Sequence, residues 1–184
     1  MQGLIGNVCF LRFAIIMCKG CITAFLLLIM SLCSVKLVAS ENLCKIGEKI
    51  IFSCLTSKKK IISLCLEKNK NKLQYRFGKK SKIEMIFPNQ ESNTLSYFKY
   101  SNYFRYQTEY SAISFKNDDF IYSIYNKYEG NGYKENMSGI DVYQVKKHKH
   151  IVAIQCKKNS LENFPLVSDQ LACDTDNPLS SCID

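Results

Sequence analysis

Apolar and polar residues alternate along several short stretches of this chain, and a period of two restricts those stretches to β-structure. The clearest example is residues 72–78, where one face of an extended backbone carries Leu73, Tyr75 and Phe77. The opposite face carries Lys72, Gln74 and Arg76. Successive side chains of a strand point to opposite sides of the sheet, so this pattern predicts a strand with one buried face.

The same pattern recurs along most of the chain. In residues 82–88 the expected inward residues are Ile83, Met85 and Phe87, and Pro88 ends the run. Polar, Lys-rich or Gly-containing turns separate the runs. The candidate runs are 49–55, 61–66, 72–78, 82–88, one or two within 95–110, and then 111–115, 120–125, 140–145 and 151–156, from which we expect a fold of about eight strands. The predicted fold is an all-β antiparallel meander that forms a small barrel or sandwich, with one short helix at 160–171.

The first 40 residues differ from the rest of the chain. They carry three basic residues and no acidic one, an apolar run at 21–33, and Val38-Ala39-Ser40 after it. This is the arrangement of a cleaved signal peptide, with translation starting at Met1 or Met17. An uncleaved membrane anchor is the alternative, but the run is shorter than the roughly 20 apolar residues that span a bilayer. Leu32 disfavours a lipoprotein at Cys33, because a small residue is expected there. We therefore expect a periplasmic or secreted protein that meets a membrane only through its leader.

Ten cysteines occur in the chain, and four of them lie within the leader. The remaining six are an even number in a protein expected to be exported, which favours three disulfides. If 52–54 and 63–65 form a hairpin with a four-residue loop at 58–61, residue 54 faces residue 65 at disulfide distance. We therefore predict Cys54–Cys65; a local clip Cys173–Cys182 in the tail would leave Cys44–Cys156, but the sequence alone does not choose the partners of these four cysteines. Structural zinc is disfavoured, because the mature part has no Cys-x-x-Cys or Cys-x-x-x-x-Cys spacing.

Charge divides the chain after the leader into two parts. Removing three of the 25 basic residues with the leader leaves 22 against 16 acidic residues, a net charge of +6. All 22 lie in the predicted β domain, 41–158, whose net charge is +11, whereas the disulfide-clipped tail, 159–184, carries −5. A basic body can favour anionic envelope polymers, although scattered lysines more often serve solubility. We do not expect nucleic acid as a partner.

Motifs with catalytic chemistry do not occur in the sequence. No Gly-x-Ser-x-Gly elbow or phosphate-binding glycine loop occurs, so we predict no catalytic, cofactor-binding or metal-binding residue. His148 and His150 form a possible metal pair without a third histidine. Asp118 and Asp119 are expected to form a turn rather than a carboxylate pair.

Aromatic residues are concentrated between Tyr97 and Tyr133. They can form either a stacking surface for sugars or bases or packed strand faces, and we favour packing. Asn136-Met-Ser138 is a glycosylation sequon, relevant only in a eukaryotic secretory pathway.

Several segments resemble, in the same order, a set of small secreted bacterial proteins without an assigned function. The shared segments are Phe52-x-Cys54, Ser63-Leu-Cys65, Leu73-Gln-Tyr-Arg-Phe-Gly78, the strand ending at Pro88, Gly139-Ile-Asp-Val142 and Ile154-Gln-Cys156. The resemblance spans roughly residues 44 to 160. It implies export, a β architecture and a Cys54–Cys65 pair, but it transfers no activity. A looser likeness to periplasmic lysozyme inhibitors rests on size, export and disulfides, and the basic body argues against it.

These observations favour an exported, non-enzymatic binding protein over an enzyme. An inhibitor or immunity-type partner of another protein is one form that such a protein can take. The alternatives are an enzyme with an unrecognised site and a surface protein that binds anionic cell-envelope polymers.

Overall fold

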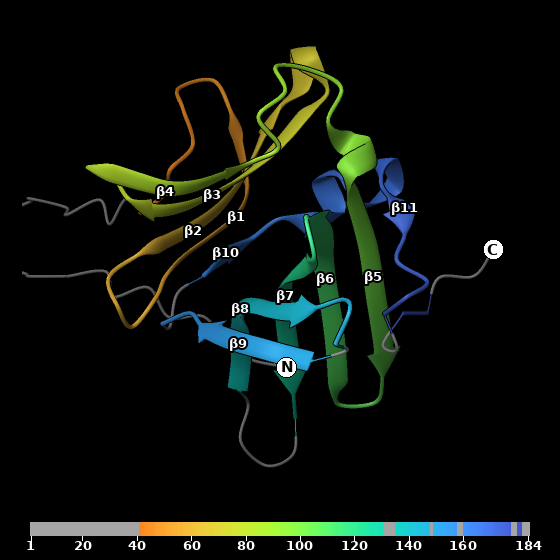
Figure 1. Ribbon diagram of the computed structural model, residues 1–184. Helices are drawn as coiled ribbons and strands as arrows, with labels where there is room; N and C mark the ends of the chain where they lie inside the picture. Colours follow the sequence, from red (N-terminus) through yellow and green to blue (C-terminus); the bar gives the residue numbers. More distant parts are fainter. Residues whose placement is uncertain (1–40, 131–134, 148, 158–159, 178–179, 182–184) are drawn as a thin grey trace, which may run out of the picture. The chain divides into compact units, whose positions relative to one another are not determined.

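The described part of the chain is an all-β structure of two sheets (Figure 1). The computed structural model describes residues 41–130, 135–147, 149–157, 160–177 and 180–181. The predicted leader, 1–40, lies outside these residues. One sheet has five strands in the order β10-β1-β2-β3-β4, and the other has six in the order β11-β5-β6-β7-β8-β9. Their bounds are β1 Lys49–Leu55, β2 Ile61–Glu67, β3 Lys72–Lys79, β4 Lys82–Phe87, β5 Phe98–Arg105, β6 Thr108–Asn117, β7 Phe120–Glu129, β8 Glu135–Gln144, β9 Lys149–Gln155, β10 Leu161–Glu162 and β11 Ala172–Cys173.

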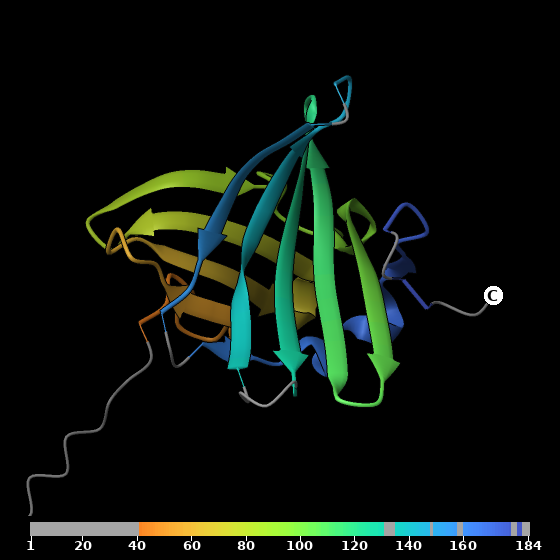
Figure 2. The ribbon, with the colours of Figure 1, turned by 90° about the horizontal axis from the view of Figure 1, so that it is seen from below.

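The two sheets pack against each other through one hydrophobic core (Figure 2). Tyr75 of β3 and Phe87 of β4 reach across to Phe115 of β6, with ring centroids 5.1 and 4.6 Å apart. The strands remain in two separate sheets, so the sandwich expected from the sequence describes the fold better than a closed barrel. Of the predicted inward residues, Leu73 and Tyr75 belong to this core, and the partly buried Phe77 packs against it.

The predicted hairpin of β1 and β2 forms, but its register differs from the prediction. The turn begins at Thr56, whose backbone N–H and side-chain hydroxyl both bond to the carbonyl of Lys60, and Lys59 adopts a left-handed conformation. Cys54 therefore pairs with Ile62 instead of Cys65. A bulge at Ile51 changes the register again, and Cys65 pairs with Ile50. The two cysteines lie on opposite faces of the sheet, because Cys65 is three positions, an odd number, after the partner of Cys54.

The predicted disulfide pairs Cys54–Cys65 and Cys44–Cys156 are accordingly wrong. Cys44 pairs with Cys65 on the outer face, and Cys54 pairs with Cys156 on the core side. The second bridge joins the end of β1 to the residue after β9 and so links the two sheets. Cys173 is also disulfide-bonded, whereas Cys182, its predicted partner, lies outside the described residues.

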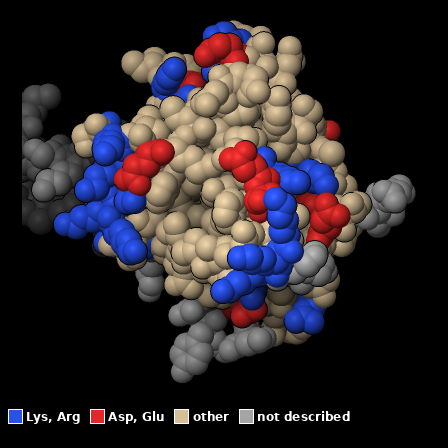
Figure 3. All heavy atoms as spheres, viewed as in Figure 1, with Lys and Arg blue, Asp and Glu red and all other residues tan. Residues whose placement is uncertain are grey.

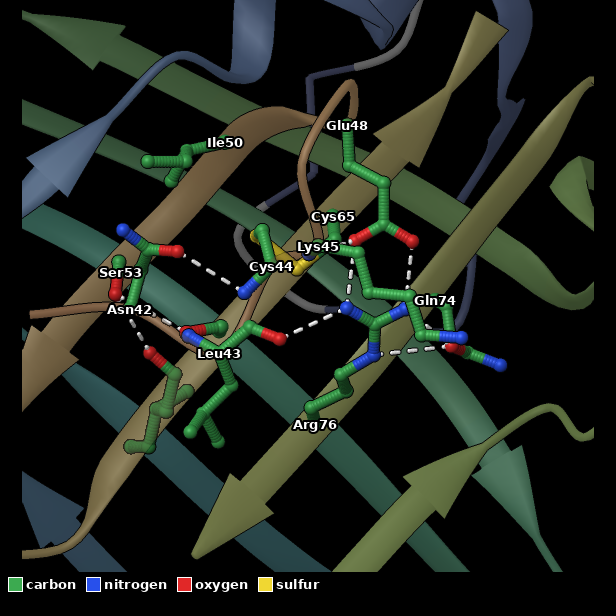
Figure 4. The surroundings of a disulfide bond; sticks show 12 residues. Asn42, Leu43, Cys44, Lys45, Glu48, Ile50, Ser53, Cys65, Gln74 and Arg76 are labelled. Carbon is green, nitrogen blue, oxygen red and sulfur yellow. Dashed lines mark hydrogen bonds and ion pairs between the residues drawn. A yellow bond between two sulfur atoms is a disulfide. The ribbon is translucent and has the colours of Figure 1, made fainter. Parts of the chain in front are cut away.

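The outer face of β3 is buried as well, contrary to the alternation seen in the sequence. Lys72, Gln74 and Arg76 are 5, 6 and 1% exposed. The segment before β1 folds back over this face, where the Cys44–Cys65 bridge holds it (Figure 4). Arg76 donates to both carboxylate oxygens of Glu48, at 2.6 and 2.7 Å, and to the carbonyl of Leu43 at 2.8 Å. Its remaining N–H groups reach the side-chain oxygen of Gln74. All five guanidinium donors are thus satisfied, which is what allows this charge to be buried.

Two further expectations are corrected at the edges of the sandwich. Ile83 on the edge strand β4 is 42% exposed, whereas Met85 and Phe87 pack against the core. Residues 160–171 form the short strand β10 and two 3₁₀ turns, Phe164–Leu166 and Ser168–Gln170, instead of one helix. This segment is not helical because β10 pairs with β1 and because Phe164 packs in the core. The described part of the acidic tail therefore belongs to the sandwich, because β11 also pairs with β5.

Candidate functional site

Three neighbouring strands of the six-stranded sheet carry a row of polar residues on the face away from the core. Ser114 of β6 pairs with Ser123 of β7, and Ser123 pairs with Asp141 of β8. The pairing of β6, β7 and β8 is unbroken, so alternation places all three side chains on one face. This row lies in an open hollow of about 640 Å³, hereafter called the hollow.

The walls of the hollow are mainly aromatic and apolar. Tyr110, Tyr125 and Tyr143 come from β6, β7 and β8, and Tyr97 comes from the turn before β5. Gly139 lies directly across from Tyr125. A Cβ at Gly139 would be 3.0 Å from the Tyr125 hydroxyl and 2.4 Å from the Ile154 carbonyl oxygen, so only glycine fits there. Burial, followed by the nearby Asp141 carboxylate, raises the pKa of both Tyr125 and Tyr143. Their hydroxyls therefore stay protonated at neutral pH.

The acidic tail forms one side of the hollow. After β11, the Asp174 N–H donates to the carbonyl of Tyr100 at 2.8 Å. The buried Asp174 carboxylate accepts a hydrogen bond from the hydroxyl of Ser114. Farther along, the Asn177 amide donates to Ser101 at 3.0 Å. The tail thus supplies Asp174 as a second carboxylate at the floor of the hollow, in addition to Asp141.

Ser123 is the unusual member of the polar row. It is 7% exposed, and its hydroxyl has no hydrogen-bond partner among the described residues. A buried hydroxyl without a partner costs about 1–3 kcal/mol in mutational data. Native structures hold few such groups, and each calls for an explanation such as a bound water, an ion or a ligand.

Charges around the hollow balance. The lining includes three lysines and three aspartates, Lys99, Lys116, Lys127, Asp141, Asp174 and Asp176. Lys99 pairs with Asp176 at 3.1 Å, and Lys127 pairs with Glu129 outside the lining. His150 approaches Asp141 at 3.4 Å. On the face drawn in Figure 3, basic groups lie beside acidic ones, with wide uncharged areas between them. No single sign of charge dominates the surroundings.

The residues singled out from the sequence have mixed outcomes. Asp118 and Asp119 form the β6–β7 turn as predicted, with Asp118 left-handed and Asp119 paired to Lys146. His148 lies outside the described residues. In the part of the chain that the structure covers, one group of potential metal ligands occurs, Cys44, Glu48 and Cys65, and its sulfurs are joined in a disulfide. Asn136 of the sequon is exposed at the start of β8.

The aromatic stretch has more than one role. Phe98 and Phe115 are buried in the core, as the favoured interpretation predicted. Tyr97, Tyr110 and Tyr125 line the hollow, and Phe104 and Tyr106 are 79 and 86% exposed at the β5–β6 turn.

The polar row itself was missed by the sequence analysis. A signal for it exists in the outward positions of β6 and β7, where Ser114 and Ser123 are small and polar while their neighbours are aliphatic or aromatic.

Comparisons with known proteins give no relatives. No family model, no curated protein and no solved structure matches this chain. Across the described residues, no helix has the length and apolar character needed to cross a membrane.

Proposed function

We propose that this is an exported, non-enzymatic binding protein whose recognition site is the hollow on the outer face of the six-stranded sheet. The carrying observation is Ser123, a buried hydroxyl without a described partner, within an aromatic-walled cavity of about 640 Å³. Small-molecule sites have volumes of about 300–1,000 Å³ and combine apolar walls with a few placed polar groups. The hollow has this combination.

Export is supported by the oxidised cysteines. The bridges Cys44–Cys65 and Cys54–Cys156 are both built into the sandwich, and one of them closes a separation of 102 residues. Structural disulfides persist mainly in oxidising compartments, such as the periplasm and the extracellular space. The signal-peptide pattern of residues 1–40 agrees with this assignment.

Binding without catalysis is supported by the chemistry of the hollow. Activation of a serine nucleophile requires an adjacent base that takes its proton. Ser114 donates to the Asp174 carboxylate, a much weaker base than the imidazole that activates the serine of a catalytic triad, and the hydroxyl of Ser123 meets no base within the described structure. A rigid sheet that presents hydroxyls and carboxylates is suited to hydrogen-bonding a ligand.

A thermal-shift panel tests this proposal. The purified mature protein is heated with neutral sugars, amines, nucleotides and cell-wall fragments, and the products are checked for hydrolysis. We expect at least one class to raise the Tm of the wild type, with a smaller shift in Tyr143→Ala and an unchanged shift in Ser57→Ala, a turn residue on the other sheet. Robust turnover of a panel member, or shifts equal in wild type and Tyr143→Ala, would contradict the proposal.

A partner protein is a second candidate, favoured by the β5–β6 turn. Phe104 and Tyr106 flank Arg105 there and expose most of their surface. Aromatic residues and arginine dominate the energetics of protein interfaces, which suits an inhibitor or immunity-type role. Comparing the proteins that co-purify with the wild type and with Phe104→Ser/Tyr106→Ser tests this candidate, and identical sets would refute it. Binding to anionic polymers has less support, because acidic groups adjoin the lysines (Figure 3).

A further inference from the structure

We propose that the ligand of the hollow is a neutral saccharide, held with its hydroxyls on the polar row and its apolar ring face on the tyrosines. This inference rests on the proposed function and specifies the class of ligand. Three properties of the hollow carry it: the balance of charge, the kind of hydrogen-bonding groups on the floor, and the aromatic walls.

Charge balance excludes a strong preference for an ion. The carboxylates of Asp141 and Asp174 lie at the floor, where they would repel an anionic ligand. Lysines in the same lining would oppose a cationic one, and their number equals that of the aspartates. Opposite charges that cancel leave little net field to attract or select a charged molecule. A neutral ligand avoids desolvating an ion in this site.

The floor suits a ligand that has many hydroxyl groups. Asp141 and Asp174 are separated by the two serines of the row, so carboxylate acceptors stand at both ends and two hydroxyls lie between them. Neighbouring strands are about 4.8 Å apart, so the row extends over about 10 Å. A sugar hydroxyl both donates and accepts. It can donate to a carboxylate and also bond to the hydroxyl of Ser123 as donor or acceptor, whereas a protonated amine can only donate.

The walls suit the ring of a sugar. A pyranose has an apolar face formed by its C–H groups, which packs on an aromatic ring, and a polar rim of hydroxyls. Tyr110, Tyr125 and Tyr143 offer apolar ring surface together with a hydroxyl. The volume is in the range of sites for drug-sized ligands, which corresponds to a di- or trisaccharide.

Three disaccharides with the same ring skeleton test the inference. Cellobiose is neutral, the glucosamine dimer is cationic and the glucuronic acid dimer is anionic. Isothermal titration calorimetry with the mature protein should give cellobiose an affinity at least about ten-fold above either charged dimer, which corresponds to one hydrogen bond to a charged group. Its affinity should change little with salt, because no ion pair forms.

Two conservative variants locate the binding. Asp141→Asn should lower the affinity for cellobiose by about ten-fold, whereas Asp169→Asn, an exposed aspartate in a 3₁₀ turn, should not change it. Ser123→Ala should weaken binding and also raise the Tm of the free protein, because it removes a buried hydroxyl that has no described partner. A serine with only a packing role would not couple these two effects.

The outcomes separate this inference from the proposed function. Tighter binding of a charged dimer in the hollow would overturn the saccharide assignment but keep the hollow as a binding site. Cellobiose affinity that is unaffected by Asp141→Asn and Ser123→Ala would overturn the assignment too. If no panel compound binds in the hollow at all, both proposals fail.

Discussion

Replacing Glu48 by glutamine tests whether the buried ion pair at the amino end of the domain holds its outer layer in place. Arg76 and Glu48 have side chains that are 1 and 6% exposed, and two hydrogen bonds join them. Glu48→Gln keeps the shape of the side chain but removes its charge. The Arg76 guanidinium then stays buried without a counter-ion, within a set of acceptors arranged for a carboxylate.

The expected loss is large for a single isosteric change. Removing one partner of a buried pair costs about 3–5 kcal/mol, and a domain of this kind has about 5–15 kcal/mol of unfolding free energy. Glu84 provides a matched control, because it contacts Lys60 at the same 2.6 Å but both side chains are about one third exposed. Exposed pairs contribute about 0–1 kcal/mol, so Glu84→Gln should lose less than about 1 kcal/mol.

Urea unfolding under non-reducing conditions measures both losses. The chain has 11 tyrosines and no tryptophan, so tyrosine fluorescence and circular dichroism are the suitable signals. Intact disulfides keep the unfolded state the same in the wild type and both variants. If Glu48→Gln and Glu84→Gln lose the same small free energy, burial does not control the strength of these pairs and our reasoning is wrong.

Three further predictions concern pH and the disulfides. Burial alone would raise the pKa of Glu48, but hydrogen bonds from Arg76 and the Lys45 backbone lower the pKa overall. The stability that Glu48 contributes should therefore be present above about pH 4.3 and be lost as the pH falls through the lowered pKa. The unfolding free energy of Glu48→Gln should decrease less on acidification than that of the wild type. Burial raises the pKa of Tyr75 far above its usual value. Tyr75 ionises first in the unfolded state, so the unfolding free energy should fall above about pH 10, and less steeply in Tyr75→Phe. Base titration followed by circular dichroism measures this difference. In urea unfolding, removing the Cys54–Cys156 bridge should lower the unfolding free energy by about 4–5 kcal/mol, and removing the shorter Cys44–Cys65 bridge should lower it by about 3 kcal/mol. Peptide mapping that recovers Cys54 joined to Cys65 would contradict the observed pairing.

Strand existence was predictable because it depends on local alternation. Residues 72–78 and 111–125 have clear patterns, and the structure has β3, β6 and β7 there. The buried polar face of β3 was not predictable in the same way. A lysine, a glutamine and an arginine are normally exposed, and only the fold-back of residues 43–48 provides the partner that buries Arg76.

Register decided the disulfide pairing, and register depends on a single turn. The sequence Thr56-Ser-Lys-Lys-Lys60 gives no strong sign of where the chain reverses, and the predicted register placed Cys54 opposite residue 65, three positions beyond its observed partner Ile62. The left-handed residue is Lys59, where asparagine or glycine would have marked the position. A shift of this size moves Cys65 to the other face, which exchanges its partner.

The candidate site was hidden for a different reason. Ser123 and Asp141 are 18 residues apart and look ordinary in isolation, and Asp174 comes from the tail. Their proximity is a product of the long-range pairing of β6, β7 and β8 and of the parallel contact of β11 with β5. The aromatic stretch was the one local feature of the sequence that pointed to the site. Some of its residues lie in the core and others line the hollow.

Residues 41–48 attach to the outer side of the five-stranded sheet, where the Ser53 hydroxyl donates to the carbonyl of Glu41 and the Cys44–Cys65 bridge follows. The hollow opens on the opposite outer side of the sandwich, because its row faces away from the shared core. A fluorophore, purification handle or solid support attached before Glu41 is therefore joined to the domain on the surface opposite the hollow. Immobilisation through that end orients the domain with its cavity toward the solution.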